Sequence, residues 1–204
     1  QERCNAETFP NEEILPSAQV LLLYFIYNGT VEITTSQASK ELGLTPTSIS
    51  RASRQLEKLG LIQTMKTGKQ KIIHSDSSPK ELFERTQQKL LNPVKKTVYI
   101  PKNCVTSELL ESGYFALAHY TMINVPQIKC FAIDSISRWK DVMTNSLLDS
   151  ENQMAVEMWR YNPHLLSKED KVDELSLALS LRDDADERVE AAVDEMLEKL
   201  WGKI

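Results

Sequence analysis

Apolar positions recur at steps of three and four residues over residues 46–59, and this spacing predicts an amphipathic helix. Thr45 is a suitable cap for the start of this helix. Pro46 suits the first helical position, because its missing N–H would be unpaired there in any residue. The apolar face is formed by Ile49, Ala52, Leu56 and Leu59. We expect this face to pack on a hydrophobic core.

A shorter helix is predicted just before it, with Ala38 and Leu42 on its apolar side. Thr35 can cap the start of this helix, and Gly43 permits the positive φ angle that ends many helices. The pattern therefore predicts two helices joined by a short turn.

The pattern changes after Gly60, which ends the longer helix. Two strands are predicted at residues 61–66 and 70–74, and the turn between them is Thr67-Gly68-Lys69. Helix, turn, helix and hairpin in this order are typical of the winged helix-turn-helix. In that fold the second helix enters the major groove of DNA, and the hairpin, called the wing, lies against the phosphates.

Flanking segments extend this unit on both sides. Residues 20–27 are almost all apolar and predict a buried helix, which Ser17 can cap. Another helix should begin at Ser78-Pro79 and continue to Asn92-Pro93, where the proline ends it. We expect a tail at residues 1–16, a winged helix-turn-helix domain at 17–91 and a second domain at 92–204.

The second domain has a mixed pattern. Strands are predicted at residues 97–100, 128–133 and 154–159, and a helix over residues 108–120. A final helix is predicted from the apolar positions Val189, Val193, Met196, Leu197 and Leu200. The expected fold class is α+β: a winged helix-turn-helix domain, then a mixed α/β domain that ends in helices.

The net charge of −5 over 204 residues argues against a nucleic-acid partner, but the charge is unevenly distributed. Residues 35–74 hold seven Lys and Arg against two Asp and Glu, a local charge of +5. Residues 141–204 hold seven Lys and Arg against 16 Asp and Glu, a local charge of −9. The predicted DNA-binding segment is therefore basic, and the C-terminal region should repel a phosphate backbone.

Polar side chains on the helix at 46–59 suit a DNA groove. Hydroxyls fit close to the bases, and arginine can donate two hydrogen bonds to guanine O6 and N7. The expected DNA-binding residues are Thr45, Thr47, Ser48, Ser50, Arg51, Arg54 and Lys58 on the helix, with Lys66, Lys69 and Lys71 on the wing. The alternatives stay open: Arg51 and Arg54 as solvated charges pairing with Glu57 or Gln55, and the wing lysines as protection of an exposed hairpin edge.

This segment, TTSQASKELGLTPTSISRASRQLEKLGLI followed by QTMKTGKQKII, resembles the winged helix-turn-helix of bacterial MarR-like transcriptional regulators. The resemblance covers roughly residues 17–91 and implies a recognition helix at residues 46–58 with a buried side at 49–59. It also implies wing cations at Lys66, Lys69 and Lys71. The best-known members dimerise through flanking helices. We see no long helical arm to match them, so a homodimer stays open.

The second half has a weaker resemblance. The segments SGYFALAHYTMI and VDELSLALSLRDDADERVEAAVDEMLEKLW are similar to the C-terminal part of bacterial MarR-like proteins. Some of these lie beside nucleotidyltransferase-type toxins, as abortive-infection antitoxin regulators do. Such relatives often have Asp-Pro where this chain has Asp173-Glu174, and they can have an additional N-terminal domain. Because the first residue is Gln1, we expect the chain to be a fragment of a longer protein.

Other side chains give no pattern of a chemical site. The cysteines and histidines are scattered, no catalytic serine motif surrounds Ser48, and Asp183-Asp184 lacks the spacing of a calcium loop. We therefore expect no enzyme, no cofactor and no metal. No apolar run approaches the ~20 residues that span a bilayer, so we expect a cytoplasmic protein without membrane contact.

Two functional hypotheses follow. The first is a sequence-specific regulator of transcription whose partner is double-stranded DNA, with the recognition helix at 46–59 and the wing at 61–74. The second is a protein-interaction module or antitoxin whose acidic C-terminal half binds a partner protein. Trp201 could fill the core or anchor an interface, and a small-ligand pocket between the domains also stays open.

Overall fold

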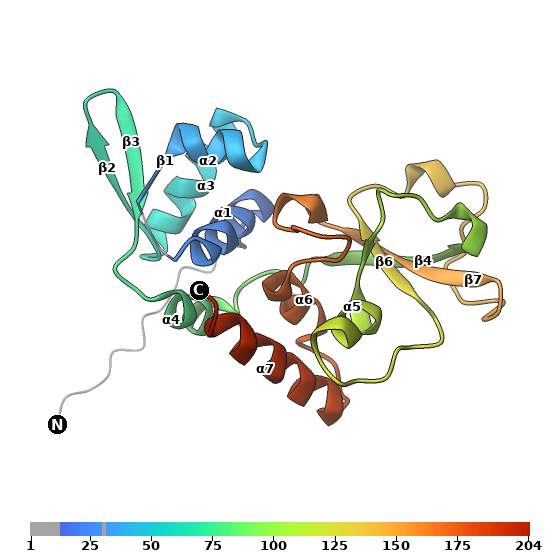
Figure 1. Ribbon diagram of the computed structural model, residues 1–204. Coiled ribbons are helices and arrows are strands. Elements are labelled where there is room, and N and C mark those ends of the chain that lie inside the picture. Colours follow the sequence, from blue (N-terminus) through green and yellow to red (C-terminus); the bar gives the residue numbers. More distant parts are fainter. Residues whose placement is uncertain (1–12, 30–31) are drawn as a thin grey trace.

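The computed structural model describes residues 13–29 and 32–204. Its N-terminal part has three helices, α1 (Pro16–Tyr27), α2 (Thr35–Leu42) and α3 (Pro46–Lys58). A three-stranded antiparallel sheet accompanies them, with β1 (Ile33–Thr34), β3 (Gln70–His74) and β2 (Gln63–Thr67) in that order across the sheet. The hairpin β2–β3 projects beyond the helices (Figure 1). The whole described chain is α+β.

Helix α3 forms as its sequence predicts at the start. The Thr45 hydroxyl accepts a hydrogen bond from the Ser48 N–H at 3.1 Å, and Pro46 is the first helical residue. Ile49, Ala52 and Leu56 are fully buried against the core. Leu59 is only half-buried, because it is already the residue that ends the helix.

Two predicted helix caps are wrong. Thr34, rather than Thr35, caps α2, because its hydroxyl reaches the Gln37 N–H three residues ahead at 3.1 Å. Thr35 is the first residue inside the helix. Helix α1 has Leu15 at its cap position with no side-chain hydrogen bond, so Ser17 caps nothing there, and Pro16 starts the helix. The predicted end of α2 at Gly43 is confirmed by a φ of +59°.

Two further boundaries differ from the prediction. Strand β2 begins at Gln63 instead of Leu61. Leu61 and Ile62 are both buried and do not show the alternating exposure of a strand. Helix α4 (Pro79–Thr86) ends six residues before the predicted break at Asn92-Pro93.

Two carbonyl oxygens just beyond the end of α4 have a long-range partner. Arg182 donates hydrogen bonds from Nη1 to the carbonyl oxygens of Gln87 and Leu90, at 2.8 and 2.7 Å. Carbonyls at a helix end need such partners when the helix does not continue. Leu90 remains buried in the loop, so the apolar pattern extends beyond the helix.

The second sheet has four strands in the order β4 (Val94–Pro101), β7 (Gln153–Trp159), β6 (Cys130–Ile133) and β5 (Leu110–Glu111). Strand β7 pairs antiparallel to β4 and parallel to β6, and β5 is antiparallel to β6. The three strands predicted in this half are confirmed. Three short 3-10 helices also lie here: Lys102–Cys104, Ser137–Trp139 and Pro163–Leu165.

Three helices accompany this sheet: α5 (Gly113–Tyr120), α6 (Glu174–Leu181) and α7 (Glu187–Trp201). The helix predicted over residues 108–120 is wrong in its first part, where β5 forms. Gly113 starts α5 with a φ of +55°, and a Cβ at this residue would lie 3.3 Å from the Cys130 Sγ. The chain therefore changes from strand to helix at a residue that has no side chain. The predicted final helix is confirmed as α7.

One large hydrophobic core contains side chains from both halves, and a second, smaller core packs around the four-stranded sheet. Phe83 of α4 lies 5.8 Å from Trp201 of α7, measured between ring centroids. Trp201 thus packs on its own chain. The boundary predicted near residue 92 stays a prediction. No helix in the described ranges is both long and apolar enough to span a membrane.

Candidate nucleic-acid interface

The outer face of α3 is polar and accessible. Thr47, Arg51, Arg54 and Lys58 are exposed, and Ser48 and Ser50 are half-buried. The opposite face is buried, so the helix cannot turn these side chains inward without removing the core residues from the interior. The predicted contact residues on α3 therefore lie together on one accessible surface. Thr45 is also exposed, although its hydroxyl is used by the helix cap.

The alternative partners of the α3 arginines are engaged elsewhere. Glu57 accepts hydrogen bonds from both the N–H and the hydroxyl of Thr64 in β2. Gln55 is buried and contacts the chain before α1. Neither Arg51 nor Arg54 has an ion pair with a described residue. Glu57 and Gln55, the two partners that the sequence suggested for Arg51 and Arg54, therefore bond to other groups in the structure.

Gln55 holds residues 13–15 against α3. Its Oε1 accepts a hydrogen bond from the Leu15 N–H at 2.8 Å, and its Nε2 donates to the Glu13 carbonyl oxygen at 3.0 Å. A hollow of about 310 Å³ lies at this place, lined by Glu13, Leu15, Arg51, Arg54, Gln55 and Lys58. The α3 cations therefore border a recess rather than a flat surface.

The hairpin presents a second group of cations. Lys66 and Lys69 are exposed and Lys71 is half-buried, and none of the three has an ion pair with a described residue. Lys66 lies directly opposite Lys71 in the antiparallel register. Like charges in this position repel each other. An anion bound at the hairpin would relieve this repulsion.

A third feature links the helices to the hairpin. A hollow of about 200 Å³ is lined by Thr35, Ser36 and Ser39 of α2, Pro46 and Ser50 of α3, and Lys71 of β3. Hydroxyls, a lysine and the first turn of a helix are groups that hold phosphate. Sequence analysis missed the α2 residues here. Thr35 was considered only as a helix cap, and Ser36 and Ser39, which follow it on the same short helix, were not considered.

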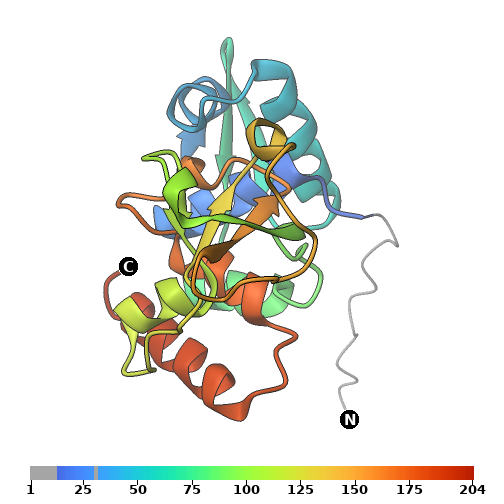
Figure 2. The same ribbon diagram turned by 90° about the vertical axis from the view of Figure 1, so that its right-hand side faces the viewer.

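The acidic side chains of α7 lie away from this surface. Exposed carboxylates follow the length of α7: Glu187, Glu190, Asp194, Glu195 and Glu198. In Figures 1 and 2, α7 lies at the opposite end of the molecule from the tip of the hairpin β2–β3. The unequal charge along the sequence thus becomes a separation of charge in space.

The histidines and the described cysteines form no shared site. His74 bonds to Gln63, His119 to Glu111, and His164 to the Glu108 carbonyl oxygen. Cys104 and Cys130 are free thiols, and burial raises the pKa of Cys130 well above its usual value. Cys4 lies outside the described residues. Within residues 13–29 and 32–204, no group of three or more His, Cys, Asp or Glu side chains could hold a metal ion.

Comparison of the chain with protein-family models, with curated proteins and with solved structures found no match. A functional argument therefore depends on the geometry described above. Three parts of that geometry contribute to it: the α3 arginines, the hairpin lysines and the hollow lined with hydroxyls.

Proposed function

We propose that the chain is a sequence-specific regulator of transcription that binds double-stranded DNA through a winged helix-turn-helix. The order α1, α2, α3, β2, β3 supports this assignment, because it is the order of helices and hairpin that the sequence pattern predicts for the fold. The short strand β1, which was not predicted, pairs with β3. The observation that carries the proposal is the outer face of α3. There Arg51 and Arg54 are exposed while Glu57 and Gln55 bond to other groups.

In this proposal α3 lies in the major groove. Arg51 and Arg54 donate to base edges, and Thr47, Ser48 and Ser50 make the closer contacts that short hydroxyls allow. The lysines of the hairpin hold phosphates on one side of the groove. The hollow between α2, α3 and Lys71 takes a further phosphate, which would set how deeply α3 enters the groove.

Selection of duplexes from a random pool tests the proposal. The wild-type chain should enrich one motif at near-physiological salt, and the variant Arg51→Ala/Arg54→Ala should enrich none. A palindromic motif would also indicate a dimer, since two-fold symmetry in a site mirrors that of the protein. If neither protein enriches a motif, the proposed function is wrong.

A second candidate function is a protein-interaction module or antitoxin that binds a partner through its acidic half. It is favoured by the exposed carboxylates of α7 and by nearby exposed apolar side chains. Met122 and Val125 are 93% and 65% exposed, and they line a groove with α7. A partner that is still bound after Arg51, Arg54, Lys66 and Lys69 are replaced by alanine would favour this function over DNA binding.

A further inference from the structure

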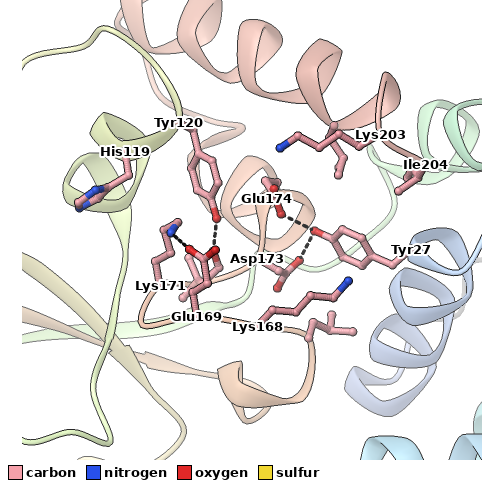
Figure 3. Close-up of a pocket in the computed structure, with 13 residues that line it drawn as sticks. Tyr27, His119, Tyr120, Lys168, Glu169, Lys171, Asp173, Glu174, Lys203 and Ile204 are labelled. Atoms are coloured by element: carbon pink, nitrogen blue, oxygen red, sulfur yellow. Dashed lines mark hydrogen bonds and ion pairs between the residues drawn. The ribbon is translucent and has the colours of Figure 1, made fainter.

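A separate pocket lies where the end of α1 meets the C-terminal half of the chain (Figure 3). Its volume is about 460 Å³. Tyr27 comes from α1, and the other lining residues come from α5, the start of α6, the end of α7 and the loop that leads to α6. The walls combine apolar side chains, such as Leu166 and Leu200, with charged groups of both signs.

A buried carboxylate is the decisive feature of the pocket. Asp173 is only 4% exposed. Its Oδ1 accepts hydrogen bonds from the Ser176 N–H and the Tyr27 hydroxyl, both at 2.9 Å. Its Oδ2 is also buried and has no hydrogen-bond partner in the described part of the chain. A buried acceptor without a partner costs free energy, and a ligand that supplies a donor would recover it.

A second carboxylate lies beside the first. Glu174 Oε2 is 3.3 Å from the Tyr27 hydroxyl, so this hydroxyl lies between two acids. The same Tyr27 oxygen accepts a hydrogen bond from the Leu175 N–H at 2.9 Å. One hydroxyl proton cannot serve both acids. Burial raises the pKa of Asp173, which means that it disfavours the ionised form, and a cation bound beside this carboxylate would offset that cost. This part of the pocket therefore favours a cation.

The charged groups at the outer part of the pocket are three lysines, His119 and Glu169. Lys171 pairs with Glu169, and His119 pairs with Glu111. Lys168 and Lys203 are exposed and have no ion pair with a described residue. Figure 3 shows their ammonium groups on either side of the Asp173 and Glu174 carboxylates. An acidic group in the opening of the pocket would be held between two lysines.

We propose that this pocket binds a small zwitterion of the amino-acid type. Its protonated amine would donate to Asp173 Oδ2 near Glu174, and its acidic group would accept from Lys168 and Lys203. The side chain of such a ligand would lie along the apolar wall at Leu166 and Leu200. A lone anion would face the two acids, and a lone cation would leave both lysines unused, so a ligand with both charges fits best.

Thermal unfolding with each of the twenty L-amino acids at millimolar concentration tests this proposal. At least one should raise the melting temperature by roughly 5–10 °C when it is in hundred-fold excess over its Kd. The N-acetyl and the amide forms of that amino acid each lack one charge and should bind at least about tenfold weaker. The proposal is overturned if no amino acid binds, or if the acetylated form binds equally well.

Variants locate the site. Asp173→Asn should weaken binding about tenfold or more, and asparagine caps helices as well as aspartate, so α6 keeps its start. Lys203→Met changes an exposed side chain and should also weaken binding, whether or not Asp173→Asn folds. Lys140→Met makes the same change at another exposed position and should leave the affinity unaltered. Equal affinities for Lys203→Met and Lys140→Met would exclude this pocket.

Binding at this pocket does not depend on the proposed DNA contact. An effect of the ligand on duplex affinity is expected only if the proposed DNA binding is correct. Such an effect would act through Tyr27 and α1, which packs against α3. Melting temperature reports the ligand site, and duplex selection without ligand reports the DNA site. Failure of one proposal is therefore distinguishable from failure of the other.

Discussion

Helices α3 and α7 are both amphipathic, with 13 and 15 residues, and each buries one face in the same core. They differ in how their charges are partnered. On α7, Arg188 pairs with Asp186 at 2.7 Å and Lys199 with Glu195 at 2.5 Å. On α3, Arg51 and Arg54 have no ion pair with a described residue.

The first turns of the two helices also differ in charge. The first turn of α7 contains Glu187 and Glu190, which suit the positive end of a helix dipole. The first turn of α3 contains no acidic residue. Both helices have a capping side chain at the start and a lysine in the last turn, so α7 differs from α3 in its acidic first turn and in its paired arginine. The comparison teaches that helix stability accounts for the paired charges of α7 and does not account for Arg51 and Arg54 of α3, which the proposed DNA contact would explain.

The largest effect on stability should come from residues on the buried faces of α3 and α7. Leu56→Ala in α3 and Leu200→Ala in α7 should each lower the free energy of unfolding by about 2–5 kcal/mol, because each leaves a cavity. All three tryptophans lie at residue 139 or later. Because the core is continuous, Leu56→Ala should also lower the denaturant midpoint that tryptophan fluorescence reports.

Circular dichroism on the same samples provides the second probe of that unfolding. Its midpoint should coincide with the fluorescence midpoint in wild type and in both variants. Val142→Ala, at an exposed position, is the matched control and should change the free energy of unfolding by less than about 0.5 kcal/mol. A fluorescence midpoint that ignores Leu56→Ala would show that the two halves unfold separately.

The next largest effect should be on duplex affinity, and it should distinguish the exposed face of α3 from that of α7. Arg51→Ala and Arg54→Ala should each cost about 1–3 kcal/mol in affinity for the selected duplex, because each removes a base contact. Arg188→Ala on α7 removes the same side chain and should leave the affinity unchanged. Fluorescence anisotropy with a labelled duplex measures all three. Equal losses for Arg54→Ala and Arg188→Ala would contradict the role assigned to α3.

A smaller effect is expected at the hairpin. Lys66→Gln and Lys69→Gln should weaken binding to all duplexes alike, because phosphate contacts are independent of sequence. Each should reduce the slope of log affinity against log salt by about 1. Lys199→Gln is the control on α7. An unchanged slope in the hairpin variants would mean that these lysines only protect an exposed edge.

The smallest effect concerns the start of α7. Hydrogen bonds from the Arg188 side chain and backbone hold the pKa of Asp186 below its usual value of 3.8. A carboxylate of this kind stabilises the fold when ionised, so its contribution is complete above that value and is lost as the pH falls through its folded pKa.

The variant Asp186→Asn tests this expectation. The difference in melting temperature between wild type and Asp186→Asn should be greatest at neutral pH and should shrink below about pH 3.8. Asp194→Asn, on the same helix, is the control and should show a smaller difference throughout. A constant difference across the pH range would rule out the ionised cap.

Sequence periodicity predicted α3, α7 and the hairpin because each has a regular apolar face and clear turn residues. The cap of α2 was predicted wrongly because two neighbouring residues, Thr34 and Thr35, both have a side-chain hydroxyl. Only the folded backbone shows which hydroxyl reaches the Gln37 N–H. The segment that follows α4 is bonded by Arg182, which is more than ninety residues away along the chain.

The candidate sites divide in the same way. The cations of α3 follow from helix spacing, so they could be predicted. It could not be predicted that Glu57 and Gln55 bond to other groups instead of Arg51 and Arg54, because these bonds are made to Thr64 and to residues 13–15. The zwitterion pocket combines α1 with residues more than 140 positions later, and no local pattern indicates such a pairing.

Gln55 also gives the protein a mechanical property. Its two hydrogen bonds to residues 13–15 join the chain ahead of α1 directly to α3. A force applied at residue 13 would load the Glu13–Gln55 hydrogen bond first. It would then load Ile14, which is buried in the hydrophobic core, together with the Leu15–Gln55 bond. Tension on the segment before α1 would therefore act first on α3, the helix that presents Arg51 and Arg54.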